Sequence, residues 1–162
     1  MSCIVETGIG KGVIEEYRWI QRGTVSFSKV EGKRQKRINV IAAQTCEGIK
    51  APFTFEGSCN TELFESYIEK ILCPVLKPKQ VVIMDNATFH KSKNIKNLIK
   101  NKDCQLIFLP PYSPEYNPIE HYWAILKRCV KKIRKTVTDI WEAIKQAIAS
   151  TENFGQSIEV WL

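Results

Sequence analysis

The sequence predicts an α/β fold in which a mixed sheet is flanked by helices. Short β-branched runs fill the first third of the chain, and amphipathic segments at helical spacing appear after residue 60. Between residues 81 and 109, an apolar run, an amphipathic segment and a second apolar run follow one another. The first pattern is typical of an antiparallel meander, and the last of two parallel strands joined by a crossover helix. We therefore expect a single domain over residues 1–162.

The first half of the chain contributes the meander and one helix. The expected β segments are short, and the longest of them, INVIAAQ, follows a basic cluster. They cover residues 3–7, 16–21, 25–30, 38–44 and 53–55. Residues 60–72 then carry apolar side chains at helical spacing, with Asn60 or Thr61 as the cap and Pro74 as the stop.

The second half contributes the parallel strands and the remaining helices. Residues 81–85 (VVIMD) form a run that is too short and too β-branched for a helix, which predicts a buried strand. An amphipathic helix over residues 92–102 and a strand over residues 105–109 follow. Two helices, at about 118–135 and 138–151, close the predicted fold.

Composition and charge limit the partners. The chain has 162 residues and 44% apolar content, which suits one ordinary core. No stretch reaches the roughly 20 apolar residues of a membrane span, and no secretory signal opens the chain, so we expect a cytoplasmic protein without a membrane partner. The formal net charge of +7 favours a polyanionic partner.

The positive charge is concentrated in two clusters, which are the candidate nucleic-acid contacts. The first comprises Lys33, Arg34, Lys36 and Arg37, and the second comprises Lys127, Arg128, Lys131 and Lys135. Clustered cations suit phosphate binding. The alternative reading is that both clusters are solvated turns and helix faces.

Two acids stand where α/β folds place their sites. Asp85 ends the predicted strand, and Glu120 lies in the first turn of a predicted helix, so both carboxylates are expected at one edge of the sheet. Two hard oxygen ligands there suggest Mg²⁺. Each acid also has a structural reading, because Glu120 completes a capping box with Asn117, and Asp85 is able to cap the turn after its strand. His90 and His121 lack partners at metal-ligand spacing, which favours hydrogen bonding or DNA contact.

Two segments carry a family resemblance. MDNATFH (84–90) and LPPYSPEYNPIEHYWAILK (109–127) resemble the signature of DDE transposases of the mariner-like superfamily, in the bacterial insertion-sequence branch. The 34 residues from 86 to 119 separate Asp85 from Glu120, a spacing similar to that of the family's second and third acids. The resemblance extends through ETGIG, YRWIQRGT, GKRQKRINVIAA and FEGSCNTELFESYIEKIL, and so covers nearly the whole chain. It implies an RNase H-like fold, in which a central mixed sheet of five strands is flanked by helices.

The resemblance also implies a chemistry. Transposases of this type cut at transposon ends and join a 3′ hydroxyl to target DNA, using two divalent ions, Mg²⁺ or Mn²⁺. Asp85 and Glu120 would be the second and third metal ligands. His90 would either orient Asp85 or contact a phosphate, and the two basic clusters would guide the DNA backbone. The implied partners are the transposon ends and the target DNA, with a homodimer bringing two ends together in a nucleoid-associated bacterial complex.

The chain departs from the family pattern at the first acid. The family places an Asp in the first strand where this chain has Val5, and Glu6 stands next to it. Because successive strand side chains point to opposite faces, Glu6 substitutes for the missing acid only if the register slips or a bulge re-aims it. The helix-turn-helix region that such transposases usually carry is also absent, which implies a separate N-terminal DNA-binding part.

Three functions therefore stay open. The first is a transposase catalytic domain. The second is another RNase H-like nuclease, acting on RNA/DNA hybrids or junctions, although NPIEHYW and LPPYSPEYNP are similar to transposases and not to ribonucleases H. The third is a catalytically inactive transposase remnant that still binds DNA, because losing a bridging carboxylate costs several kcal/mol of metal binding and transition-state stabilisation.

Overall fold

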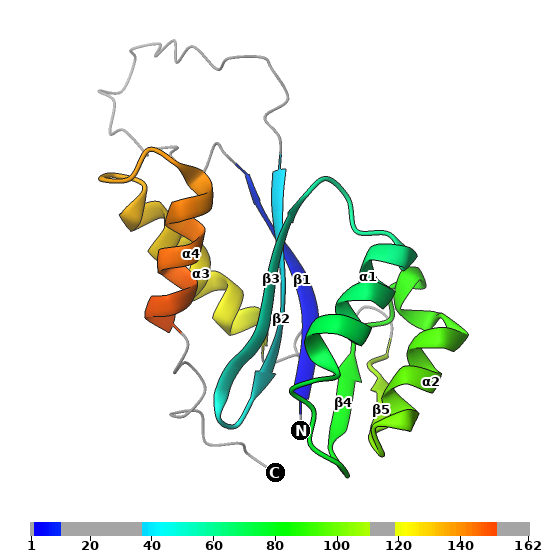
Figure 1. The fold of residues 1–162 in the computed structure, drawn as a ribbon. Helices are drawn as coiled ribbons and strands as arrows, with labels where there is room; N and C mark the ends of the chain where they lie inside the picture. The colour runs from blue at the N-terminus through cyan, green and yellow to red at the C-terminus, as the bar shows by residue number, and fades with distance from the viewer. Residues whose placement is uncertain (1, 11–36, 111–118, 152–162) are drawn as a thin grey trace.

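A single mixed sheet forms the centre of the structure, a computed structural model that describes residues 2–10, 37–110 and 119–151 (Figure 1). Its strand order is β3-β2-β1-β4-β5. The strands are β1 Ser2–Gly10, β2 Arg37–Thr45, β3 Gly48–Glu56, β4 Val81–Met84 and β5 Gln105–Phe108. The first three strands pair antiparallel, whereas β4 pairs parallel with both β1 and β5. The expected α/β class, with a meander before the parallel strands, is confirmed.

Helices cover both faces of this sheet (Figure 1). One face carries α1, a π-helical turn and α2, and the other carries α3 and α4. Their bounds are α1 Thr61–Tyr67, the turn Ile68–Leu72, α2 Lys93–Asn101, α3 Ile119–Ile133 and α4 Ile140–Thr151. No helix within the described ranges is long and apolar enough to cross a membrane.

Each layer of helices has its own core. On the α3/α4 face, fully buried Trp123 and Tyr122 pack with Val40 of β2. On the α1/α2 face, Phe64 and Ile95 pack with apolar side chains that include Met84 at the end of β4. Alternate residues of β2 contribute their side chains to one core or the other, as the two-residue period of a strand requires.

Several predicted bounds of strands and helices were wrong. β1 continues past residue 7 to Gly10 because its pairing with β2 extends to Arg37. β3 is nine residues long and contains Pro52, which an edge strand tolerates. Residues 60–72 are not one regular α-helix, since a π-helical turn follows α1. The segments 16–21 and 25–30 lie outside the described residues.

β3 carries a bulge near its middle. Ile41 pairs with Phe53 and Ala43 with Lys50, so two β3 residues lie opposite one β2 residue. One of these two, Ala51, has a positive φ of 53°, and its carbonyl accepts a hydrogen bond of 3.0 Å from the Tyr67 hydroxyl. The edge strand is therefore bent and locked to α1.

Side-chain caps fix the helix starts. Asn60 accepts from the Leu63 amide at 2.9 Å, which confirms the predicted cap of α1. Ser92 caps α2 through the Asn94 amide at 3.1 Å. Asp139 accepts from the amides of Trp141 and Glu142 at the start of α4. These bonds satisfy amides that a helix start leaves unpaired.

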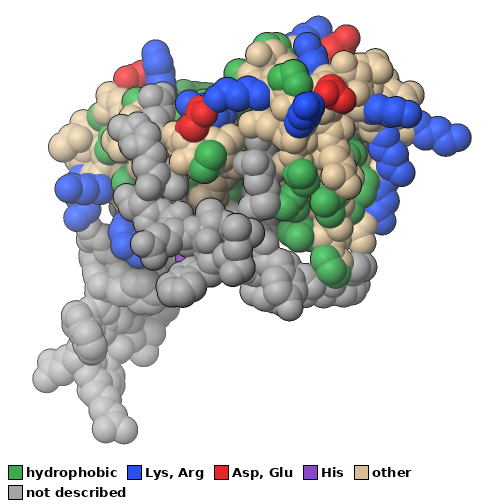
Figure 2. Space-filling view, turned by 90° about the horizontal axis from the view of Figure 1, so that it is seen from below, with side chains coloured by type: hydrophobic (Ala, Val, Ile, Leu, Met, Phe, Trp, Pro, Cys, Tyr) green, Lys and Arg blue, Asp and Glu red, His purple; other side chains and the backbone are tan. Residues whose placement is uncertain are grey.

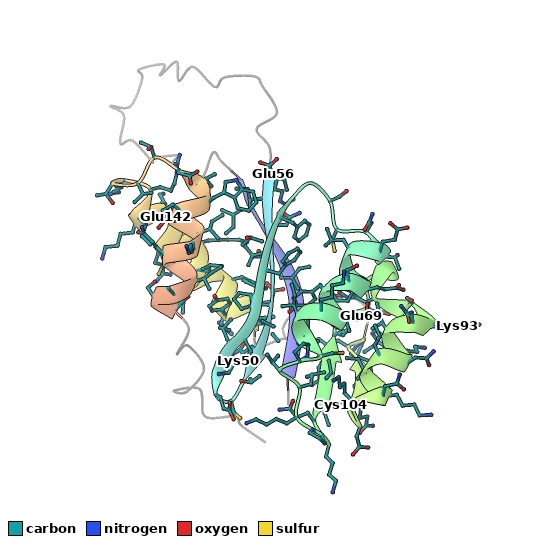
Figure 3. The ribbon with its side chains drawn as sticks, viewed as in Figure 1. Lys50, Glu56, Glu69, Lys93, Cys104 and Glu142 are labelled. Carbon is teal, nitrogen blue, oxygen red and sulfur yellow. The ribbon has the colours of Figure 1, made fainter. Side chains whose placement is uncertain are left out.

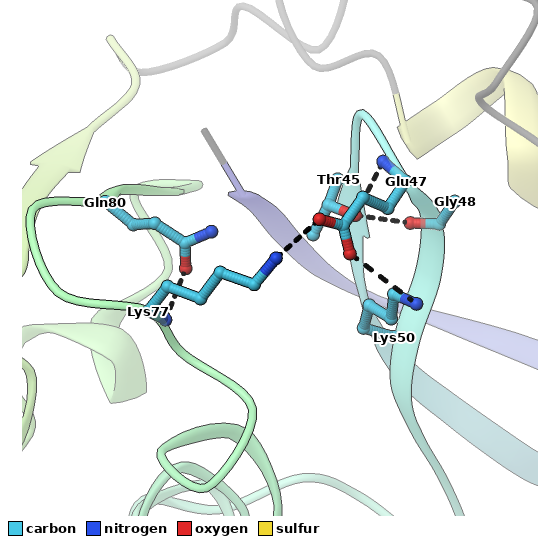
Figure 4. A network of polar contacts seen from close by, with 6 residues as sticks. All are labelled: Thr45, Glu47, Gly48, Lys50, Lys77 and Gln80. Atoms are coloured by element: carbon cyan, nitrogen blue, oxygen red, sulfur yellow. Dashed lines mark hydrogen bonds and ion pairs between the residues drawn. The ribbon is translucent and has the colours of Figure 1, made fainter.

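A surface ion pair joins the β2–β3 turn to the loop before β4 (Figure 4). The Lys77 ammonium donates to Glu47 at 2.5 Å, and Lys50 lies 3.9 Å from the other Glu47 oxygen. The hydrogen bond from Lys77 lowers the pKa of Glu47. Because both partners are largely exposed, solvent screens this pair.

Candidate active site

Asp85 follows directly on β4, at the carboxyl end of a strand that lies between β1 and β5. Val82 and Met84 anchor that strand in the α1/α2 core. The Asp85 side chain is 42% exposed, so it is both fixed by the strand and reachable by a ligand. Strand ends of this kind are where open α/β sheets bind their ligands.

One oxygen of Asp85 is held by its own neighbours in sequence. A 3₁₀ turn over Thr88–Lys91 follows Asp85 and returns His90 to it. The His90 Nδ1 lies 2.6 Å from Asp85 Oδ1, and the Ala87 amide donates to the same oxygen at 3.1 Å. Within the described residues no partner is bonded to Oδ2, which leaves that oxygen for a ligand.

The His90 ring packs against Phe64 of α1. Its side chain is 1% exposed, and its ring centroid lies 4.1 Å from that of Phe64. A side chain buried to this extent is poorly placed to reach a DNA phosphate, so its burial argues against the predicted contact of His90 with DNA. The other sequence-based reading, that His90 orients Asp85, fits the geometry.

The same contacts set the charge of Asp85. Partial burial raises the pKa of its carboxyl, but the hydrogen bond and electrostatic interaction with His90 act in the opposite direction and lower it. With the added Ala87 amide, the pKa of Asp85 is held below its ordinary value. Asp85 is therefore an anion at neutral pH, as a cation ligand must be.

Glu120 lies in the first turn of α3 and is exposed. The residue before it, Ile119, is fully buried in the α3/α4 core, which fixes the start of the helix against the sheet. His121 is exposed beside it. Asn117, the partner in the alternative capping box, lies outside the described residues.

The register of β1 places position 5 level with the candidate site. The parallel β1–β4 pairing runs to Ile4 opposite Met84, so the next step along both strands brings Val5 level with Asp85. In the antiparallel pairing with β2, Val5 is the partner of Ala42, which belongs to the α3/α4 core. Glu6 is the partner of Ile41, which belongs to the α1/α2 core. The side chains of positions 5 and 6 lie outside the described residues.

Two carboxylates are a suitable type of ligand for a divalent cation, because hard cations prefer oxygen ligands. In the part of the chain that the structure describes, no group of three His, Cys, Asp or Glu side chains is placed to hold a metal ion. Asp85 and Glu120 are the two ligands that the sequence predicts, and one step beyond the Ile4–Met84 pair the strands bring a valine, not a carboxylate, level with Asp85. The predicted pair is therefore an incomplete donor set for two ions.

Comparison with protein families matches residues 1–154 to the family described as DDE superfamily endonuclease. The chain belongs to the DDE superfamily. Asp85 and Glu120 are both within the matched residues. Chemistry in this superfamily generally uses divalent metal ions, which agrees with the oxygen donors at the candidate site.

Individual proteins support the same assignment. The chain is 33% identical over 75 residues to the transposable element Tcb2 transposase of Caenorhabditis briggsae, covering 41% of this chain and 28% of that protein. It is 25% identical over 130 residues to an insertion element IS630 protein of Shigella sonnei, covering 79% and 37%. The chain thus spans well under half the length of these relatives.

A solved structure with the same fold is the Mos1 strand transfer complex. The TM-score is 0.64 at 16% sequence identity, and the match covers 94% of this DDE-superfamily chain and 55% of that chain. At this identity the likeness concerns the fold alone. It agrees with the mixed sheet between two helical layers.

The predicted basic residues occupy different settings. Lys127 and Arg128 are exposed on α3, about two turns beyond Glu120, and Lys131 follows about one turn later. Lys135 is exposed but lies two residues past the end of α3. Arg37 starts β2, and its guanidinium covers Gly8 so closely that a Cβ there would lie 1.8 Å from Arg37 Nε. Lys33, Arg34 and Lys36 lie outside the described residues.

Proposed function

We propose that this DDE-superfamily chain is the catalytic part of a transposase, which cleaves DNA at transposon ends and transfers the cut strand to target DNA. The observation that carries the proposal is Asp85, whose Oδ1 is fixed by His90 and Ala87 while Oδ2 stays available at the end of β4. The strand order and the likeness to the Mos1 complex support an RNase H-like fold for it.

In this proposal, Asp85 Oδ2 and the Glu120 carboxylate hold Mg²⁺ or Mn²⁺. Bound divalent ions would activate the attacking oxygen and stabilise the leaving oxygen at phosphorus. The protein itself keeps Asp85 ionised and in one orientation through His90. Lys127 and Arg128 on α3 hold DNA phosphates near Glu120 and supply affinity without sequence choice.

The valine at position 5 supports a second candidate, an inactive remnant that binds DNA. Its register position level with Asp85 is where a third carboxylate would bridge two ions. With Asp85 and Glu120 alone, the proposed two-ion site has to recruit another oxygen donor. Glu6, the substitute that the sequence offers, pairs with Ile41 of the α1/α2 core, whereas position 5 pairs with Ala42 of the α3/α4 core.

The proposal includes two further partners. A homodimer would hold two transposon ends for joining. Sequence-specific recognition of those ends would belong to a separate DNA-binding part, because lysine contacts to phosphate carry no sequence information.

The test is strand transfer with a pre-cleaved oligonucleotide of the element's end and a plasmid target, in Mg²⁺ or Mn²⁺. The unaltered chain is compared with Asp85→Ala and Val5→Asp, and His121→Ala serves as a control. Activity in the unaltered chain that disappears in Asp85→Ala supports the transposase. Activity that appears only in Val5→Asp supports the inactive remnant, and cleavage of an RNA/DNA hybrid without strand transfer supports a ribonuclease.

A further inference from the structure

The outer face of α2 forms a second basic surface that the sequence analysis assigned to no partner. It comprises five exposed lysines on α2 and its flanks: Lys91, Lys93, Lys96, Lys100 and Lys102. No Asp or Glu occurs from residue 86 to residue 102. We call these five residues the α2 lysine row.

Helical geometry gathers the three lysines within α2 on one side. Ile95 and Ile99 are fully buried and define the inner face of α2. Lys93, Lys96 and Lys100 follow the i, i+3, i+7 pattern on the opposite face and span about 10 Å along the axis. Figure 3 shows Lys93 projecting outward, and Figure 2 shows a row of basic side chains on the side of the molecule that α2 occupies.

The row is poorly neutralised. Within the described residues, no carboxylate lies within ion-pair distance of any of the five ammonium groups. The nearest acid in α1, Glu65, is already bonded to the Ser92 hydroxyl and to Asn94 Nδ2. Lys96 lies over the Phe108 ring, 5.9 Å from its centroid. Like charges at this spacing repel one another, so an anionic partner would relieve a cost the free protein bears.

The row starts beside the candidate active site. The 3₁₀ turn that brings His90 to Asp85 ends at Lys91, and α2 begins two residues later. From there the row extends along the face opposite to α3, because α2 and α3 belong to different cores. A straight duplex that follows Lys127 and Arg128 on α3 therefore does not also follow the α2 lysine row.

We propose that the α2 lysine row binds the phosphate backbone of a second DNA segment, separate from the segment held along α3. Phosphate binding by the row stands on its charge and geometry. The presence of two segments rests on the proposed function, since strand transfer brings a transposon end and a target together. The row supplies affinity and position, and no sequence reading.

Binding of a short mixed-sequence duplex in EDTA tests this without any catalysis. The variant Lys93→Gln/Lys96→Gln/Lys100→Gln is expected to lower the slope of log K against log salt by about 2 to 3, near 0.9 per lost phosphate contact. The matched control, Lys50→Gln/Lys70→Gln/Lys145→Gln, removes the same charge from scattered sites and should retain most of the slope. Urea unfolding confirms that each variant is folded.

An unchanged slope in the α2 variant, or an equal loss in the control, overturns the proposal. The number of duplexes bound per chain then tests the two segments, with Lys127→Gln/Arg128→Gln/Lys131→Gln as the α3 variant. Separate surfaces predict two duplexes for the unaltered chain and one for the α2 variant or the α3 variant, because a straight duplex does not follow both surfaces. One duplex per unaltered chain overturns the second segment. Absence of strand transfer alters none of these readouts, so the two proposals fail separately.

Discussion

Asp85 and Glu120 are held in place by different means. The Asp85 carboxylate is fixed by two hydrogen bonds from residues within five positions of it, His90 and Ala87. Glu120 is exposed, and what fixes it is the helix beneath it, through buried Ile119 and Trp123. One acid is therefore positioned by local contacts, and the other by long-range packing. The two should respond to different substitutions.

The largest expected effect is on the packing that positions Glu120. Trp123→Ala removes a side chain that is 1% exposed in the α3/α4 core, and should cost about 3 to 5 kcal/mol of unfolding free energy. Urea titration measures this cost. Trp141→Ala, at 37% exposure on α4, is the control and should cost far less. Equal losses would mean that α3 is not anchored by Trp123.

The next effect concerns the local contacts of Asp85, and the two histidines make a matched pair. His90→Ala should weaken Mn²⁺ binding about 10- to 100-fold, the usual range for losing a partner of a metal ligand. His121→Ala, exposed beside Glu120, should leave it unchanged. Electron paramagnetic resonance of free Mn²⁺ gives the affinities. His90→Gln, which restores a donor, should recover part of the loss, whereas a purely structural role for His90 predicts no recovery.

A smaller effect is expected in the pH dependence of stability. A carboxyl whose pKa is lowered by folding stabilises the protein above its unfolded-state pKa, about 3.9. That stabilisation is lost as the pH falls through the lowered, folded-state pKa of Asp85. The difference in unfolding free energy between the unaltered chain and Asp85→Asn should therefore shrink between neutral pH and about pH 3. A difference that grows toward acid would contradict the lowered pKa.

The smallest effect is expected for the exposed ion pair between Lys77 and Glu47. Lys77→Ala breaks the 2.5 Å contact with Glu47, yet both side chains are more than half exposed. Screening by solvent should leave the unfolding midpoint nearly unchanged. A clear loss of stability would show that the β2–β3 turn depends on this contact.

The sequence predicted the elements well where periodicity or caps mark them. The strand before Asp85 and the Asn60 cap were found because apolar runs and cap residues are local signals. The lengths of β1 and β3 were missed because pairing with β2 carries them through Gly8 and Pro52, which locally indicate breaks. Strand partners cannot be read from composition.

For the candidate site, too, local patterns are visible in the sequence and packing contacts are not. The spacing of Asp85 and Glu120 predicted them as the acids of the site, which stays a prediction, whereas the burial of His90 against Phe64 depends on the packing of α1 and has no local signal. The α2 lysine row had a visible signal, an acid-free stretch of alternating lysines and asparagines. The sequence analysis predicted an amphipathic helix there and assigned its lysines to no partner, because a single sequence does not show which charges lie beside the site.

The bulge at Ala51 bears on how copies of this protein avoid aggregating. β3 is an edge strand, and an unbroken edge is a template for pairing with the edge of another molecule. The bent backbone at Ala51 and the missing amide of Pro52 interrupt that template. The sheet is thereby discouraged from growing between molecules along this side.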